Sequence, residues 1–398
     1  MSGRIGVWLV GARGSVATTA VCGAAALRAG IAAPVGCVTE LPEVARAGLP
    51  SYGDLVFGGH DVAGAPPDKR ADELADGGVL PRRVVEGLRE ELRAVEAEIR
   101  PGYDVTSESS QRADAEGIAA DVRGFRDRHR LDRVVVVNVA SAERPFEQHP
   151  ATGSLDALEA AMDGGSAVLP ASAVYAYAAF RAGCPFVDFT PSVGARLPAL
   201  RELADAERLP WAGNDGKTGE TLVKAALAPM FAERALRVRS WAGMNLLGGG
   251  DGANLADPAV AASKLASKSA VLSTVLGHPV AGPLHIDYVP DLGDWKTAWD
   301  HVSFEGFLGV RMSLQFTWQG CDSALAAPLV LDLARLLARS HELGEVGPVG
   351  AFGFFFKDPV GSVEHRLAAQ FDALCAWAER SQTAAAGHGG AGYAGAGP

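Results

Sequence analysis

The stretch IGVWLVGARGSVATTAVCGAAALR, residues 5–28, decides the fold of this chain. Residues 5–10 are apolar and too few for a helix, so they predict a buried strand. Glycines at positions 11 and 14 then predict a turn, and the alanine-rich segment that runs to about Arg28 predicts a helix. A strand, a glycine turn and a helix form the first half of a βαβ unit, and we expect its second strand at residues 35–38 (VGCV).

Strands and helices continue to alternate to about residue 238. An amphipathic helix is predicted at residues 88–99, where apolar side chains repeat at helical spacing. A β-branched run at 134–139 is typical of a central parallel strand. The segments that follow are a helix at 171–181, a strand at 185–189 and a helix at 199–207. This alternation predicts the α/β class, with a parallel sheet flanked by helices.

The pattern changes after about Val238. Strand-like runs occur at 285–289 and 307–318, and the second run alternates apolar and polar residues, which predicts an antiparallel sheet with one covered face. Residues 323–340 return to a helical pattern, and the glycine- and alanine-rich residues 384–398 are expected to be a disordered tail. The residues expected on the covered face are Leu308, Val310, Met312, Leu314 and Phe316.

Composition narrows the class of protein. The 398 residues carry a net charge of −11, which argues against binding nucleic acid through the overall field. No apolar run reaches the roughly 18 residues that a membrane span needs, and the N-terminus shows no secretory signal. Five widely spaced cysteines indicate reduced thiols rather than a disulfide or zinc framework. We therefore expect a cytoplasmic protein with no nucleic-acid or membrane partner.

The first glycine turn favours a nucleotide phosphate. Glycines let the backbone approach a pyrophosphate, and a helix N-terminus favours its negative charge. The spacing G-x-x-G-x-x-A over residues 11–17 is not the full dinucleotide fingerprint, and a simple strand–turn–helix also needs glycine. Arg13 could pair with a phosphate or be solvated. No acidic residue lies about 20 residues further on, so Glu40 and Asp61 both remain candidates for a ribose contact.

Four lysines in the second half of the chain are candidates for chemistry. Lys264 and Lys268 are four residues apart and share a helix face, which is usually a solvated face. Lys296 lies in DWKTA, residues 294–298. Lys357 follows three phenylalanines, so it either snorkels out of a core or is held in a dry pocket.

Further polar residues adjoin glycines. Residues 214–221 (NDGKTGET) precede a helix and offer backbone N–H groups, a hydroxyl and a cation, as a phosphate site requires, although they are not a Walker A motif. Asn245, Asp251 and Asp322 could serve a site or could simply be turn residues.

Together these segments resemble the inositol-3-phosphate synthase (myo-inositol-1-phosphate synthase) family, especially its archaeal-type members. The resemblance runs from the first strand to about residue 360. The matching stretches are VWLVGA (7–12), FGGH (57–60), VNVAS (137–141), AGNDGKTGET (212–221), MNLLG (244–248), DG (251–252), KTA (296–298), DS (322–323) with AAPL (326–329), and FFK (355–357).

The resemblance implies a Rossmann-type NAD domain at 1–240, interrupted by an α+β catalytic and tetramerisation domain at 241–325, with a return to the NAD domain at 326–383. It also implies oxidation of C5 of glucose 6-phosphate by NAD⁺, enolisation, intramolecular aldol closure between C6 and C1, and reduction by the same NADH. The product would be 1D-myo-inositol 3-phosphate, in a redox-neutral reaction. A homotetramer is implied as well.

The resemblance also assigns residues. Fixed ammonium groups stabilise the negative charge of enolates, alkoxides and phosphate, and lysines can act as acids or bases. We expect Lys264 and Lys357 to serve the C5 hydroxyl proton, and Lys268 and Lys296 to serve phosphate and oxyanion, with C6 deprotonation assisted by the substrate's own phosphate. Any metal ligand stays unassigned. The other implied positions are Asn245, Asp251 and Asp322 as catalytic residues; Thr218, Gly219 and Glu220 at the substrate phosphate; and Gly11, Ala12, Arg13, Gly14, Ser15, Asp61, Asn138, Ala140, Ser141 and Asp215 at NAD.

Two alternatives stay open. Some relatives cyclise fructose 6-phosphate to a five-membered cyclitol phosphate by the same steps, so the sugar is not fixed by the sequence. An inactive, NAD-binding regulatory paralogue is the second alternative, and the presence of all four lysines and Asp322 argues against it.

Overall fold

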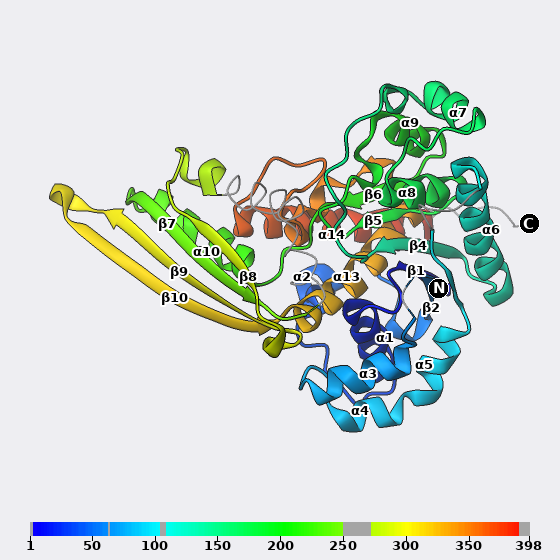
Figure 1. Cartoon of the computed structure of the whole chain (residues 1–398), viewed down its shortest axis with the longest axis horizontal. Coiled ribbons are helices and arrows are strands. Elements are labelled where there is room, and N and C mark those ends of the chain that lie inside the picture. The colour runs from blue at the N-terminus through cyan, green and yellow to red at the C-terminus, as the bar shows by residue number, and fades with distance from the viewer. Residues whose placement is uncertain (1–2, 63, 104–108, 250–271, 390–398) are drawn as a thin grey trace, which may run out of the picture.

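The structure is a computed structural model, which describes residues 3–62, 64–103, 109–249 and 272–389. Two sheets organise the chain (Figure 1). One is wrapped by helices, and the other extends from it as a layer of long strands. Within the described residues, no helix is both long enough and apolar enough to span a bilayer. All five cysteines are unpaired, as expected.

The larger sheet has seven strands in the order β11-β6-β5-β4-β1-β2-β3, and all its pairs are parallel. The parallel sheet predicted from the sequence is therefore confirmed. From β1 the chain builds outward to β2 and β3, then returns to β4 on the other side of β1. This reversal between β1 and β4 is where open α/β sheets bind ligands. The strands are β1 Ile5–Val10, β2 Leu55–Asp61, β3 Ile99–Pro101, β4 Arg133–Asn138, β5 Phe186–Asp188, β6 Pro210–Gly213 and β11 Gly347–Pro348.

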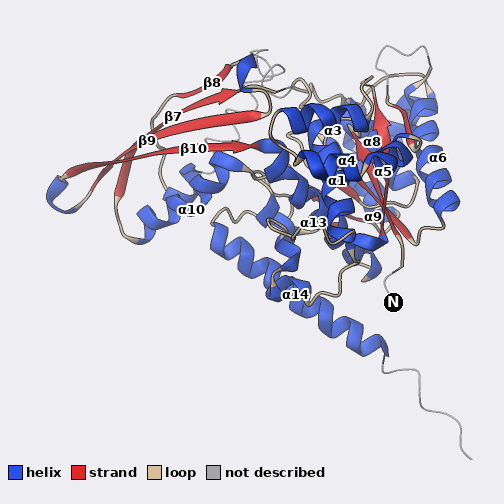
Figure 2. Cartoon of the chain, turned by 90° about the horizontal axis from the view of Figure 1, so that it is seen from below, coloured by secondary structure: helices blue, strands red, loops and turns tan. Residues whose placement is uncertain are grey.

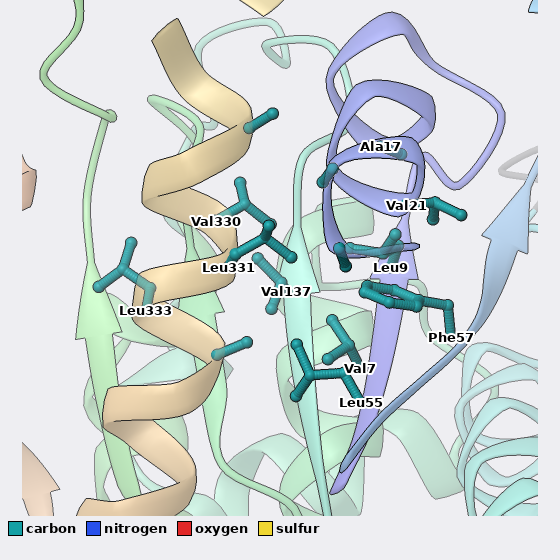
Figure 3. Close-up of a cluster of buried hydrophobic side chains, with 14 of the residues drawn as sticks. Val7, Leu9, Ala17, Val21, Leu55, Phe57, Val137, Val330, Leu331 and Leu333 are labelled. Atoms are coloured by element: carbon teal, nitrogen blue, oxygen red, sulfur yellow. The ribbon is translucent and has the colours of Figure 1, made fainter. Parts of the chain in front are cut away.

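Helices cover both faces of this sheet, because successive strand side chains point to opposite sides. Val7 and Leu9 of β1 join a core with α1, α5 and α13, whereas Trp8 and Val10 join a second core with α6, α8 and α9. Figure 3 shows Val330 and Leu331 packed over the strands of the first core. The helices are α1 Ser15–Arg28, α2 Pro42–Ala45, α3 Pro67–Asp76, α4 Arg82–Gly87, α5 Arg89–Glu96, α6 Gln111–His129, α7 Leu155–Asp163, α8 Ala171–Arg181, α9 Pro198–Ala206, α13 Asp322–Glu342 and α14 Leu367–Gly389.

The smaller sheet has the order β10-β9-β7-β8. Strand β9 is antiparallel to both β7 and β10, as expected, but β8 pairs with β7 in parallel. Helix α10 (Gly219–Glu233) lies along one face of this sheet, as Figure 2 shows, and packs Phe231 against Trp241 and Val302. The strands are β7 Arg237–Leu247, β8 Leu284–Tyr288, β9 Trp295–Glu305 and β10 Arg311–Cys321.

The expectation of a continuous covered face at 308–316 is wrong at its outer end. Leu314 and Phe316 pack against the α10 core. Leu308 instead lies in the short 3₁₀ turn Phe307–Gly309 and is 84% exposed, and Val310 and Met312 are exposed too. The reason is that β10 starts only at Arg311, so the preceding residues form the tip of the β9–β10 hairpin.

The second strand predicted at 35–38 is also wrong. Its place in the sheet is taken by β2. The backbone N–H groups of Val38 and Thr39 donate to the carboxylate of Asp332 on α13, at 2.6 and 3.3 Å. These groups are therefore satisfied by a helix side chain rather than by a neighbouring strand.

The C-terminal ends of two helices, α5 and α14, also differ from the prediction. The helix expected over 88–99 stops at Glu96, since Ile99 begins β3. The disordered tail was expected to begin at position 384, but helix α14 continues to Gly389. The alanines of this segment explain the difference, because alanine is the strongest helix former. After β10 the chain returns through α13 to the large sheet. The domain division at 240 and 325 remains our proposal.

Candidate active site

A cavity of about 390 Å³ lies at the reversal of strand order, between the two sheets. One wall consists of residues 14–16 and 139–142, which follow β1 and β4. The opposite wall carries polar side chains of the second sheet and its neighbours. The polar and charged residues that line the cavity are Ser15, Arg70, Ser141, Thr190, Asp215, Thr218, Glu220, Thr221, Asn245, Asp294, Lys296, Asp322, Ser323 and Lys357.

The glycine turn has the geometry of a nucleotide site. The N–H groups of Gly11 and Ala12 both donate to the His60 carbonyl, at 2.9 and 3.2 Å, and fix the turn after β1. Gly11 has φ +87°, and a Cβ there would come within 2.8 Å of Ala140 Cα. Helix α1 then starts at Ser15 with its N-terminus at the cavity, and no side chain caps it. These free N–H groups suit a pyrophosphate, so the residues present fit NAD.

A second cavity lies on the other side of the same turn and holds Arg13 and Asp61 among its lining residues. The backbone N–H of Arg13 donates to Asp61 Oδ2 at 2.7 Å, and the Arg13 guanidinium pairs with Glu96 at 2.6 Å. Glu40 is instead paired with Arg335 on α13. Of the two acidic candidates for a ribose contact, Asp61 is therefore the one that adjoins the glycine turn.

Lys296, Asp322 and Thr218 form one charged group in the main cavity. Lys296 is the second residue of β9, and its Nζ lies 2.9 and 3.0 Å from the two carboxylate oxygens of Asp322 at the start of α13. The Thr218 hydroxyl donates to Asp322 Oδ1 at 3.3 Å. Thr218 also precedes α10, so an ammonium group, a hydroxyl and a helix N-terminus meet here.

Lys357 and Asp215 form a second pair. Lys357 Nζ donates to Asp215 Oδ1 at 2.7 Å, and both side chains are more than nine-tenths buried. Their backbones are joined as well, because the Lys357 N–H donates to the Asp215 carbonyl at 2.7 Å. Lys357 therefore occupies a buried pocket and does not snorkel to the surface.

A buried polar network supports the β4 side of the cavity. The Asn138 amide donates to Asp188 Oδ1 at 3.0 Å, and the Asn214 amide donates to Asp188 Oδ2 at 2.9 Å. The Ala140 N–H donates to Asn138 Oδ1 at 3.2 Å. Burial raises the pKa of Asp188 to about 7. Asn138 thus holds the loop that lines the cavity without lining it itself.

The structure brings most of the expected site residues together. Those that line the main cavity are Gly14, Ser15, Ala140, Ser141, Asp215, Thr218, Glu220, Asn245, Lys296, Asp322 and Lys357. Gly219 begins α10 beside Lys296. Five other expected residues adjoin the cavity through the glycine turn or the loop after β4, namely Gly11, Ala12, Arg13, Asp61 and Asn138. Asp251, Lys264 and Lys268 lie outside the described residues.

Sequence reasoning missed several charged residues near the cavity. Arg70 and Asp294 line it, and Lys224 and Asp300 lie buried beneath Glu220. Lys224 was detectable because it lies four residues after Glu220, which is helical spacing. In the described parts of the chain, no group of three or more histidine, cysteine, aspartate or glutamate side chains is placed to hold a metal ion.

Comparison with known proteins identifies the family. A family model described as myo-inositol-1-phosphate synthase, and named for NAD binding, matches residues 5–379. Inositol-3-phosphate synthase 1 of Bacteroides thetaiotaomicron is 32% identical, over 96% of this chain and 95% of that protein. The crystal structure of inositol-3-phosphate synthase from Caenorhabditis elegans superposes with a TM-score of 0.86 at 23% identity, covering 96% of this chain and 86% of that one, and supports the fold.

A solved structure from Thermotoga maritima, titled a myo-inositol-1-phosphate synthase-related protein, gives a TM-score of 0.75 at 25% identity over 94% of this chain and 98% of its own. The fold class, the Rossmann-type sheet and the NAD cofactor expected from the sequence agree with these matches. This chain is an isomerase-type enzyme that belongs to the myo-inositol-1-phosphate synthase family.

Proposed function

We propose that this protein converts D-glucose 6-phosphate to 1D-myo-inositol 3-phosphate with NAD that is reduced and reoxidised within each turnover. The observation that carries the proposal is the meeting of two lysine side chains, Lys296 and Lys357, in one cavity with the glycine turn that precedes α1. A dehydrogenase also binds NAD and can use a lysine as its base, so the nucleotide site alone does not separate the two reactions. Two lysines opposite that site, Lys296 as a fixed cation and Lys357 as a proton carrier, suit a reaction in which the sugar phosphate carries charge at several steps.

The start of α10 is the proposed phosphate site. A helix N-terminus favours an anion, and the Thr218 hydroxyl stands at this end. The Lys296 ammonium adjoins the same turn, since a Cβ added at Gly219 would lie 3.5 Å from Lys296 Nζ. Asp322 orients Lys296 through both carboxylate oxygens. Lys296 would therefore bind the phosphate or the neighbouring oxyanion.

Lys357 is the proposed proton carrier for the oxygen on C5. Its Nζ is held by Asp215, in a position that is closed to bulk water. An amine there removes the hydroxyl proton as C5 is oxidised, and returns it when the ring ketone is reduced. Bound NAD supplies the hydride acceptor and donor for these two steps. Asp215 keeps Lys357 in place in both.

The remaining roles follow the family resemblance. We assign Lys264 to the C5 proton with Lys357, Lys268 to phosphate and oxyanion with Lys296, and Asp251 and Asn245 to the substrate. The substrate's own phosphate assists deprotonation at C6. We further propose a cytoplasmic homotetramer, as the family resemblance implies.

A product assay tests the function. Purified protein with NAD⁺ is incubated separately with glucose 6-phosphate and fructose 6-phosphate, and the dephosphorylated products are compared with authentic myo-inositol by chromatography and NMR. We expect inositol from glucose 6-phosphate with no net NADH. A cyclopentane polyol from fructose 6-phosphate alone would change the substrate, and the absence of product from either sugar would contradict a catalytic role.

A further inference from the structure

Three buried charged side chains have no place in the scheme above: Glu220, which lines the cavity, and Lys224 and Asp300, which lie behind it. Glu220 and Lys224 are four residues apart on α10, and Lys224 Nζ donates to Glu220 Oε1. Asp300 of β9 is fully buried, with its Oδ1 3.4 Å from Lys224 Nζ. Such a cluster is costly to bury unless its charges are matched.

Asp300 is the member that can be neutral. Its Oδ1 accepts a hydrogen bond from Trp241 Nε1 at 2.7 Å, and its Oδ2 has no partner among the described residues. Burial raises the pKa of the Asp300 carboxyl group. When Asp300 holds a proton, the Lys224 ammonium group is matched by the carboxylate of Glu220.

The register of the second sheet places this pair at the floor of the cavity. Gly243 of β7 pairs with Asp300, and a Cβ at Gly243 would lie 3.3 Å from Glu220 Oε1 and 3.2 Å from Asp300 Oδ1. The next residue on the same face is Asn245, which lines the cavity beside Glu220. The Asn245 amide is buried, with no partner among the described residues.

The chemistry of a carboxylate decides what it can contact. An ionised carboxylate only accepts hydrogen bonds, so it repels a phosphate and attracts a hydroxyl group. The backbone at the start of α10 suits an anion, whereas the Glu220 side chain bends back to Lys224. At Glu220, the main chain thus suits the phosphate of a sugar phosphate, whereas the side chain suits one of its hydroxyl groups.

We propose that the Glu220 carboxylate accepts a hydrogen bond from one hydroxyl group of the sugar phosphate and so helps to select the sugar, and that Lys224 is the positioning residue that holds it. The inference deepens the proposed function, on which it rests. Gly243 leaves room for the pair, and Asp300 in its protonated form adds no second negative charge beside Lys224. Glu220 thereby becomes a specificity-determining residue rather than a phosphate contact through its side chain.

Binding of deoxy sugars tests the role of Glu220. The dissociation constants of glucose 6-phosphate and of its 2-, 3-, 4- and 5-deoxy analogues are measured by calorimetry on wild type and E220Q, with NADH bound so that no oxidation occurs. For one position, loss of the hydroxyl should weaken wild-type binding by about tenfold or more and E220Q binding by less than about threefold. Equal losses in both proteins at every position overturn the proposal.

The affinity for inorganic phosphate, measured on the same proteins, tests the opposite placement of the carboxylate. Tighter phosphate binding by E220Q, with an unchanged pattern across the deoxy sugars, would place the carboxylate against the phosphate and contradict the proposal. The matched control is E143Q, because Glu143 is a partly buried acceptor for Ser172 that does not line this cavity. It should keep the wild-type pattern.

Two variants separate positioning by Lys224 from a structural role. K224M should lose the same hydroxyl preference as E220Q, and K224Q, which keeps a donor for Glu220, should retain part of it. A purely structural role would lower thermal stability without changing which hydroxyl matters. If K224M does not fold, E220Q still decides the proposal. Since these measurements need no turnover, a failed product assay would reject the proposed reaction without altering their outcome.

Discussion

The two walls of the cavity are built in different ways. The nucleotide wall is main chain from two adjacent strand ends, residues 14–16 and 139–142. The substrate wall is a set of side chains from separate elements, including Asn245 of β7, Lys296 of β9 and Asp322 of α13. A main-chain site depends on backbone geometry, whereas a side-chain site depends on individual charged groups. In the sequence, the main-chain wall therefore appears as a local motif, whereas the side-chain wall appears only as dispersed residues.

The largest effect is expected from a variant that removes one charge from the substrate wall. Lys296→Ala should abolish cyclisation, a loss of about 10³-fold or more, because the ammonium group beside α10 disappears. Binding of NAD should stay within about twofold of wild type, as measured by fluorescence titration. Turnover retained in this variant would remove Lys296 from the reaction.

A second change separates stability from chemistry on the same wall. Lys357→Met alone leaves the Asp215 carboxylate buried and unmatched, so it should lower both the melting temperature and the activity. The double variant Lys357→Met/Asp215→Asn should recover most of the melting temperature, yet stay at least about 100-fold less active. Recovery of activity together with stability would show that the pair only holds the fold.

The nucleotide wall is tested through its backbone. Gly11→Ala forces a side chain into positive φ and toward Ala140, so NAD affinity should fall by about tenfold or more. Gly30→Ala is the matched control, since Gly30 has φ +68° but its Cβ would meet nothing within 4 Å. It should share the backbone strain and keep NAD affinity. Equal losses of affinity in both would refute the close-approach argument.

The smallest expected effect concerns a buried lysine, Lys217, that lines neither wall of the cavity. Lys217 is buried, donates to Gln370, and has its pKa lowered to about 7 by burial. The unfolded chain binds this proton more readily between pH 7 and about 10.4, so stability should rise over that range. In Lys217→Met, the rise in melting temperature over this pH range should be a few degrees smaller than in the wild type. An identical pH dependence in both proteins would contradict the shift.

The long-range errors of the sequence interpretation share one cause. The segment 35–38 has the composition of a strand, yet the backbone N–H of its last residue, Val38, donates to Asp332, almost three hundred residues away. The apolar alternation at 308–316 was recognised, but no local pattern shows where a hairpin turns. The helix predicted at 171–181 and the strand predicted at 134–139 agreed closely with α8 and β4, because burial of their apolar residues is consistent with local propensity.

By itself, the sequence determined the α/β class, the glycine turn and the family, and it singled out Lys296 and Lys357 as candidates, because each of these depends on residue type and short spacing. Only the tertiary structure decided how they meet. It joined Lys296 to Asp322, Lys357 to Asp215 and Glu220 to Lys224 and Asp300. It also chose Asp61 over Glu40 beside the turn. The physical reason is that ion pairs and orphaned polar groups are set by strand register and crossover, which bring distant residues within a few ångströms.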